Sequence, residues 1–485
     1  MWKVIVTSSR YQDTTTNPQP KAKWYELLQL PDYRYKAPMS TLDPRKKVER
    51  SRNLATGYTL SSLLKSEDAV SRTVEMLLGW LDKHAASGEP MHLDKFFTYT
   101  AFDVVGEVVF SKQFGFLKEG EDIGNSISNS LALNAYAAVG GFFQPWNMIV
   151  ANPFVTWLQV MPMGHLFNTT MIAINERERN PDARFDIAAH WFKMLKQHPE
   201  RMQLRDIHAQ ATTSVGAGAD TVSCGLQAFV YHMLRHPTAW GRVRAEIDAA
   251  RRERGICGDR VVAFDDAQQL PYLQACIKEA LRVFGPVPMG LPRVAPAGGL
   301  TIGDHTFPAG TILSINPWVM HHSTEIWGPD AGEFNPDRWL DPSIAAVEKY
   351  WIPVSRPRVP SPRGTMRDME LTPDCPPCSV WRWIQLVPGP ERDQDRAVQD
   401  PRHPRPRLRH PPGRQGPGVE VQGVLHRGAP FLAVLHREAE GLNFVFILEL
   451  TCIGLPGPAS WVLDHGQVDS GKGVQSRSDD EVGIR

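Results

Sequence analysis

The segment from Val215 to Thr221, which reads Val-Gly-Ala-Gly-Ala-Asp-Thr, holds the residues best suited to chemistry in this chain. A glycine inside a helix costs about 1 kcal/mol relative to alanine, and close packing against a neighbouring helix is the usual reason for one. Here Gly218 is followed by the acid Asp220 and the hydroxyl of Thr221. Such a segment lets a flat group approach the backbone and then offers a proton relay. Thr221 can also bend the helix by bonding to a carbonyl one turn back.

A second polar group lies downstream, where Glu279 and Arg282 are spaced to form an ion pair on one face of a helix. Alone, such a pair is a weak signal, because i, i+3 pairs occur on many exposed helices. Its neighbours give it weight, since Arg293 follows in Leu-Pro-Arg and Arg338 follows in Phe-Asn-Pro-Asp-Arg-Trp.

The elements that must position these residues are predicted to be mainly helices, with a small β part late in the chain. Apolar residues recur at helical spacing over 60–88, 96–110, 204–235, 239–254 and 265–284, the last with an irregularity at Pro271. Short strand-like pieces separated by Gly and Pro turns follow between 301 and 315. The apolar region 136–167 is broken by Gly and Pro, which favours short core helices, with an apolar channel mouth as the alternative.

Composition predicts a globular chain that is soluble as written. It has 485 residues, 42% of them hydrophobic, and a formal net charge of +0, which favours no polyanionic partner. Six cysteines at unrelated spacings form no disulfide framework and indicate a reducing compartment. No stretch approaches the roughly 18 uninterrupted apolar residues of a membrane span.

Taken together, these motifs resemble those of cytochrome P-450, a haem-thiolate monooxygenase, and are most similar to fungal enzymes related to pisatin demethylase. The small-Gly-x-acid-Thr signature of the family's oxygen-activating helix matches Ala217 to Thr221, and its Glu-x-x-Arg matches Glu279 and Arg282. The resemblance covers residues 40–353 and rests on four motifs in the family's order. It implies the cytochrome P-450 fold, mainly α with small β-sheets.

The resemblance also assigns roles to residues. The catalytic set would comprise Gly218, which opens the helix for oxygen, Asp220, which gates proton entry, and Thr221, which bonds the oxygen. Arg293 would bind a haem propionate. A structural network behind the haem would comprise Glu279, Arg282 and Arg338, and the substrate pocket would be lined by Phe284, Val287 and Met289.

Cofactor and partners follow from the same resemblance. They are haem b (heme b), O2, a hydrophobic small-molecule substrate and NADPH-cytochrome P-450 reductase as the electron donor. The complete family protein would lie on the cytosolic face of the endoplasmic reticulum membrane. The fungal members suggest a role in the biosynthesis of secondary metabolites.

Three departures from the family's pattern stand out. The family's N-terminal membrane helix and first strands are missing before Met1. Lys47 stands where the family often has His or Trp, which leaves Arg50 and Arg52 as candidates for a second propionate contact. The Phe-x-x-Gly-x-x-x-Cys-x-Gly loop, which carries the thiolate ligand of the iron, should lie between Pro353 and Pro388 and is absent.

The character of the sequence changes at this point. After Pro353 the chain becomes rich in Pro and Arg without hydrophobic periodicity, and no Lys occurs between Lys349 and Lys472. We therefore predict a partial catalytic domain over 1–353, a translated intron over 354–379, and an out-of-frame, irregular or disordered tail over 380–485. The alternative is a genuine Pro/Arg-rich tail with polyproline stretches.

Back-translation is compatible with the intron. Val354-Ser355 can be encoded by the splice signal GTAAGT, Leu371-Thr372 by a branch-site sequence CTGACN, and Ser379 with the first base of Val380 by the acceptor TCAG. Removing the 26 codons from Val354 to Ser379 and that one base, 79 nucleotides in total, shifts the reading frame. The codons of Val380 to Gly389 can then read Phe-Gly-Gly-Gly-Tyr-Asn-Ser-Cys-Pro, which resembles the thiolate loop.

Two functions follow from these readings. The first is a haem-dependent monooxygenase that hydroxylates, epoxidises or demethylates a hydrophobic small molecule. The second is a haem-less, non-catalytic chain that at most binds a small molecule or protein. Cys375 and Cys378 form a CxxC, but one such pair supplies half of a zinc site, so we predict no metal site other than the missing thiolate.

Overall fold

The computed structural model describes residues 20–29, 32–140, 149, 152–158, 163–180, 186–302, 304–353, 432–438 and 441–447. Its α-helices are α2 (Pro44–Leu54), α3 (Leu60–Leu63), α4 (Glu67–Ser87), α5 (Leu93–Phe110), α6 (Phe116–Glu119), α7 (Ser126–Gly140), α9 (Pro153–Trp157), α10 (Met163–Arg179), α11 (Ile187–Gln197), α12 (Leu204–Arg235), α13 (Pro237–Ala249), α14 (Phe264–Gln268), α15 (Pro271–Val283), α16 (Pro317–His321) and α17 (Thr324–Trp327).

Short 3-10 helices connect these elements: η2 (Lys23–Leu28), η3 (Ala55–Tyr58), η4 (Leu64–Ser66), η5 (Ile123–Asn125), η7 (Pro336–Trp339), η8 (Pro342–Ala346) and η9 (Glu348–Tyr350). One π-helix, η6 (Ala250–Arg254), continues α13. The predicted helix over 239–254 thus changes its hydrogen-bond pattern at Ala250 before it ends at Gly255, whose φ is +66°.

The sheets are small and antiparallel. Strand β1 (Arg293–Val294) pairs with β4 (Ile312–Leu313), with Arg293 opposite Leu313. Strand β2 (Leu300–Ile302) pairs with β3 (His305–Phe307), with Leu300 opposite Phe307. The predicted strand pieces are therefore present, together with β1, which sequence patterning missed.

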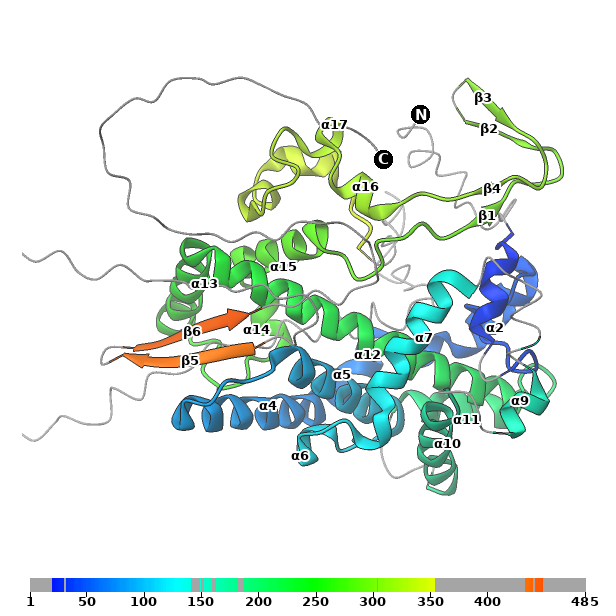
Figure 1. Cartoon of the computed structure of the whole chain (residues 1–485), viewed down its shortest axis with the longest axis horizontal. Coiled ribbons are helices and arrows are strands. Elements are labelled where there is room, and N and C mark those ends of the chain that lie inside the picture. Colours follow the sequence, from blue (N-terminus) through cyan, green and yellow to red (C-terminus); the bar gives the residue numbers. More distant parts are fainter. Residues whose placement is uncertain are drawn as a thin grey trace, which may run out of the picture.

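The long helix α12 crosses the centre of the molecule, with α5 on one side and α15 on the other (Figure 1). It begins with a capping box in which the Asp206 carboxylate accepts from the backbone N–H of Gln203 at 2.9 Å. It ends where His236 precedes Pro237, since proline disfavours helical geometry in the residue before it. These end signals explain why the predicted bounds 204–235 match the structure.

Helix α5 is buried on almost all of its faces and packs along α12, so the main core lies between α4, α5 and α12. A second core joins α13, α14 and α15, and a third gathers Trp327, Trp339 and Tyr350. The predicted helices over 60–88 and 96–110 are α3 to α4 and α5. Gly88 ends α4 with a φ of +72°, which glycine adopts readily.

One prediction needs correction. The helix expected over 265–284, with an irregularity at Pro271, is two helices, α14 and α15, because Pro271 lies at the first position of α15, where its missing N–H costs nothing. Within the tail, β5 (Leu432–Glu438) and β6 (Gly441–Ile447) form an antiparallel pair. The remainder of 354–485, including the predicted position of the thiolate loop, lies outside the described residues.

Candidate functional site

One side of α12 is only partly covered by the residues that the structure describes. Its partly exposed residues recur at helical spacing and comprise Thr213, Gly216, Ala217, Asp220, Thr221, Cys224 and Gln227. The opposite side, which includes Val215, Ala219 and Val222, is buried in the main core. The predicted proton-relay residues Asp220 and Thr221 therefore lie together on the open side of a central helix.

The hydroxyl of Thr221 donates to the carbonyl oxygen of Ala217 one turn back, at 2.9 Å. This is the backbone contact expected of a threonine inside a helix. Because its only proton is engaged there, the Thr221 oxygen keeps its lone pairs for an incoming donor.

Helix α7 contacts the carboxylate of Asp220. The Ser130 hydroxyl donates to Asp220 Oδ2 at 2.6 Å and the Asn134 amide donates to the same oxygen at 2.7 Å. Although Asp220 as a residue is partly exposed, its carboxyl group is surrounded by protein; this burial raises the pKa of Asp220, and the two hydrogen bonds offset part of that rise. Ser130 and Asn134 were missed from the sequence, since an i, i+4 polar pair on a helix does not reveal its partner.

Gly218 lies on the other side of the helix. A Cβ built on it would come within 3.0 Å of Val105 Cγ2 on α5. The glycine therefore allows α5 and α12 to approach closely, the general explanation for small residues in helices. Its role in admitting oxygen remains a prediction.

The structure brings Glu279, Arg282 and Arg338 together. Both Glu279 and Arg282 are fully buried; Arg282 Nε and Nη2 each donate to a Glu279 carboxylate oxygen at 2.8 Å. Arg338 Nε donates to Glu279 Oε1 at 3.0 Å. The Trp339 indole and the Asn335 backbone N–H donate to the same carboxylate at 2.8 and 2.9 Å. The Glu279 carboxylate thus pairs with both guanidinium groups and accepts five hydrogen bonds.

The remaining N–H groups of this network bond mainly to backbone carbonyls, and Arg338 Nη2 also donates to the Asp330 carboxylate at 2.8 Å. Arg282 donates to the carbonyls of His321 and Ala331 at 2.6 Å and of Glu333 at 2.9 Å. Its guanidinium also lies 5.4 Å from the centre of the Trp327 ring. The network therefore links α15 to the segment 321–339, which includes α17 and η7.

The predicted propionate-binding residues have separate environments. Arg293 donates to the Tyr25 hydroxyl at 2.5 Å, and Arg50 donates to the Thr41 hydroxyl at 2.8 Å and lies 3.7 Å from Asp206. Arg52 is exposed on α2. No contact joins Arg293 to Arg50 or Arg52 among the described residues.

The predicted substrate-pocket residues Phe284, Val287 and Met289 lie in the segment after α15, and all three are partly exposed. The Phe284 ring lies edge-on to Trp318, 5.9 Å between centres.

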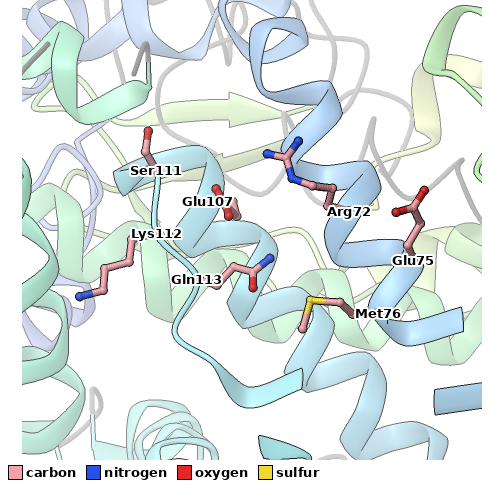
Figure 2. Close-up of a pocket in the computed structure, with 7 residues that line it drawn as sticks. All are labelled: Arg72, Glu75, Met76, Glu107, Ser111, Lys112 and Gln113. Atoms are coloured by element: carbon pink, nitrogen blue, oxygen red, sulfur yellow. The ribbon is translucent and has the colours of Figure 1, made fainter. Parts of the chain in front are cut away.

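A cavity of about 710 Å³ lies elsewhere, between α4 and the end of α5 (Figure 2). Its lining is mostly charged and polar: Arg72, Glu75, Met76, Glu107, Ser111, Lys112 and Gln113. An apolar substrate would gain little there, so this cavity is distinct from the predicted substrate pocket.

Comparison with known proteins decides the family. A family model described as cytochrome P-450 matches residues 11–355, more than half of the chain. The chain belongs to the cytochrome P-450 family.

Curated relatives agree with this membership. Cytochrome P-450 monooxygenases of Aspergillus flavus and Aspergillus oryzae are each 31% identical, over 59% and 62% of this chain and 58% and 61% of theirs. One of Emericella nidulans is 31% identical over 69% of this chain and 68% of its own. The P-450 chain thus spans about three-fifths of the first two relatives.

A crystal structure of a cytochrome P-450 shares the fold, with a TM-score of 0.58 and 17% identity over 76% of each chain. Within the described part of this P-450 chain, no helix is both long and apolar enough to cross a membrane.

The family implies haem, and the described residues of the P-450 chain fit part of its surroundings. The open side of α12 offers a face with small Ala217 and Thr221, and Arg293 offers a guanidinium for a carboxylate. The loop that would carry the axial thiolate lies outside the described residues. Of the described cysteines, Cys224 lies on the open side of α12, whereas Cys257 and Cys276 are buried in the core of α13 to α15, where burial raises the pKa of both thiols, that of Cys276 to about 12. No group of His, Cys, Asp and Glu among the described residues could hold a metal ion.

Proposed function

We propose that this gene encodes a haem-dependent monooxygenase that hydroxylates, epoxidises or demethylates a hydrophobic small molecule. The observation that carries the proposal is the placement of Asp220 and Thr221 side by side on the open side of the central helix, in a member of the cytochrome P-450 family. Haem with a cysteine thiolate ligand supplies the oxygen chemistry, because electron donation by the thiolate favours cleavage of the O–O bond.

The residues of this chain would bind the haem, orient the substrate and deliver protons. The raised pKa of Asp220 makes its carboxyl a better proton donor near neutral pH than an ordinary aspartate. Thr221 would pass a proton on through its hydroxyl, whose oxygen is free to accept. Arg293 would hold a propionate, and Phe284, Val287 and Met289 would contact the apolar substrate.

The active form requires the reading-frame change. The family model stops matching at residue 355, two residues beyond Pro353, which supports a junction there. If Gly389 is encoded by GGG and Pro390 follows, the shifted frame continues with Gly after Cys-Pro, which completes the Phe-x-x-Gly-x-x-x-Cys-x-Gly pattern. The domain division at 353 and 379 is part of this proposal.

The wider setting is proposed on the same basis. Relatives of 31% identity are monooxygenases of Aspergillus species, which supports a role in fungal secondary-metabolite biosynthesis. The electron donor would be NADPH-cytochrome P-450 reductase, and the complete protein would lie on the endoplasmic reticulum membrane.

The test compares two polypeptides, the chain as written and the product of the 79-nucleotide splice. After supply of haem and reduction, carbon monoxide should give a band at about 450 nm, the mark of a thiolate ligand, only with the spliced product. Replacing the cysteine that splicing creates by serine should remove the band. Its absence from the spliced product would refute the proposal.

A haem-less binding protein is the second candidate, favoured by the absence of the thiolate loop from the sequence as written. It predicts that transcripts retain codons 354–379 and that neither polypeptide binds haem. A band at about 450 nm from the chain as written would exclude this candidate and would also contradict the assignment of the ligand to the spliced loop.

A further inference from the structure

The segment Trp351-Ile352-Pro353, at the end of the predicted catalytic part, is held by hydrogen bonds at its first two residues and lies against Gly285 at the third. The Trp351 indole donates to the Lys278 carbonyl on α15 at 3.2 Å. The Ile352 backbone N–H donates to Nε2 of His321 on α16 at 2.9 Å. Gly285, just after α15, lies beside Pro353, since a Cβ on it would be in van der Waals contact with the Pro353 carbonyl oxygen at 3.4 Å.

His321 is the polar centre of this anchor. It is 1% exposed, and its Nε2 acts as an acceptor, so the ring is neutral with its proton on Nδ1. The backbone carbonyl of Arg282 bonds the ring and favours that N–H. This carbonyl lies in the last turn of α15, and the residue four positions on, Pro286, has no N–H to offer it. His321 therefore satisfies a carbonyl that the helix cannot.

The same residue belongs to the buried ion-pair network through its backbone. Arg282 Nη1 donates to the His321 carbonyl at 2.6 Å, while the His321 ring bonds the Arg282 carbonyl. The side chain of each residue thus bonds the backbone carbonyl of the other. Any movement of Ile352 away from His321 would leave a buried ring nitrogen without a donor, which is costly.

We propose that His321 is a positioning residue that fixes where, and in which direction, the cysteine-bearing segment leaves Pro353. The inference rests on the proposed function, because it assumes that the thiolate loop follows Pro353. It goes beyond that function in linking the Glu279–Arg282–Arg338 network to the loop through one neutral imidazole. The contacts of Trp351 and Ile352 are made by residues of the chain as written, so they do not depend on the cysteine loop.

Two amide variants distinguish the contributions of the two imidazole nitrogens, Nδ1 and Nε2. His321→Asn keeps a donor where Nδ1 lies but cannot reach Ile352, whereas His321→Gln extends to the position of Nε2. His322→Gln serves as the control, since the His322 ring bonds the Trp318 carbonyl within α16 and not Ile352.

The first measurement is site-resolved hydrogen exchange on the full chain as written. Loss of the acceptor should speed exchange of the Ile352 amide about tenfold in His321→Asn, with His321→Gln within about threefold of the parent and His322→Gln unchanged. Equal exchange in the Asn variant and the parent would overturn the proposal.

The second measurement uses the spliced product and the carbon monoxide spectrum. His321→Asn should lower the ratio of the band at about 450 nm to the inactive band at about 420 nm several-fold, and His321→Gln should restore it. If the parent shows no band, the proposed function fails. If the parent shows it and the Asn variant keeps the same ratio, the positioning role fails.

Discussion

At the scale of single residues, the protonation states of Asp220 and His321 depend on burial and on groups contributed by distant segments. Asp220 has its pKa raised by burial, and His321 is held neutral by burial and by the Arg282 guanidinium nearby. Both effects disfavour the charged form in a low-dielectric setting. The protonation states that the chemistry needs are therefore properties of the folded chain.

The neutral state of His321 predicts acid sensitivity. Burial, Arg282 and His322 lower the pKa of His321 from 6.5 to about 3, so the unfolded chain binds a proton that the folded chain does not. The free energy of unfolding should fall as pH drops below about 6.5 and continue to fall towards pH 3. Urea unfolding at a series of pH values measures this slope.

The contribution of His321 is isolated by comparing the parent with His321→Gln, which cannot titrate. Between pH 6.5 and about 4 the variant should lose stability less steeply than the parent. Identical slopes would show that His321 is not held neutral in the fold.

At the scale of elements, the contact of α5 with α12 determines which small residues are required. Val105 is 1% exposed and lies where a Cβ on Gly218 would point. Gly218 destabilises the helix itself but allows α5 to pack closely against this side of α12. The open side of α12 is the side that faces away from α5.

Two helical glycines should respond differently to alanine. Gly241 on α13 is exposed and has nothing within 4 Å of its Cβ position, so Gly241→Ala should stabilise the protein by about 1 kcal/mol. Gly218→Ala should gain none of this, because Val105 must shift. Combining it with Val105→Ala should relieve that conflict, and additive effects in the double variant would refute the explanation.

The link between α15 and η7 predicts that removing the negative charge of Glu279 lowers the free energy of unfolding strongly. Glu279→Gln leaves the fully buried Arg282 without a counter-charge and Arg338 with only its second partner, Asp330, so it should cost about 3–5 kcal/mol. The matched control is Glu348→Gln, which breaks the exposed 3.0 Å ion pair with Lys278 and should cost less than about 1 kcal/mol. Tryptophan fluorescence during urea unfolding compares the two, and equal costs would contradict the structural role of the network.

At the scale of the whole molecule, all three hydrophobic cores lie in the part of the chain that matches the family. The helices around α12 and the third core, with Trp327, Trp339 and Tyr350, extend to the segment that holds Pro353. The family match ends two residues later.

Transcript sequencing tests the reading-frame proposal directly. Mature transcripts should lack 79 nucleotides, from the first base of the Val354 codon to the first base of the Val380 codon. The joined codons should then encode Phe-Gly-Gly-Gly directly after Pro353. Transcripts that retain codons 354–379 in every tissue or growth condition would contradict it.

The sequence by itself determined the family, the helix that carries Asp220 and Thr221, and the members of the Glu279–Arg282–Arg338 network. The helix follows from helical periodicity and end signals, which are local, whereas the family and the membership of Arg338 follow from the resemblance of short motifs to those of the family. The sequence indicated an irregularity at Pro271 but not the division into two helices there, because the apolar spacing continues across the proline.

Only the tertiary structure decided which side of α12 is open, that Gly218 faces Val105, and which donors reach each buried carboxylate. Ser130 and Asp220 are 90 residues apart, and His321 and Ile352 are 31 apart. Contacts at such separations depend on how helices pack, and no local pattern encodes the partner of a polar side chain.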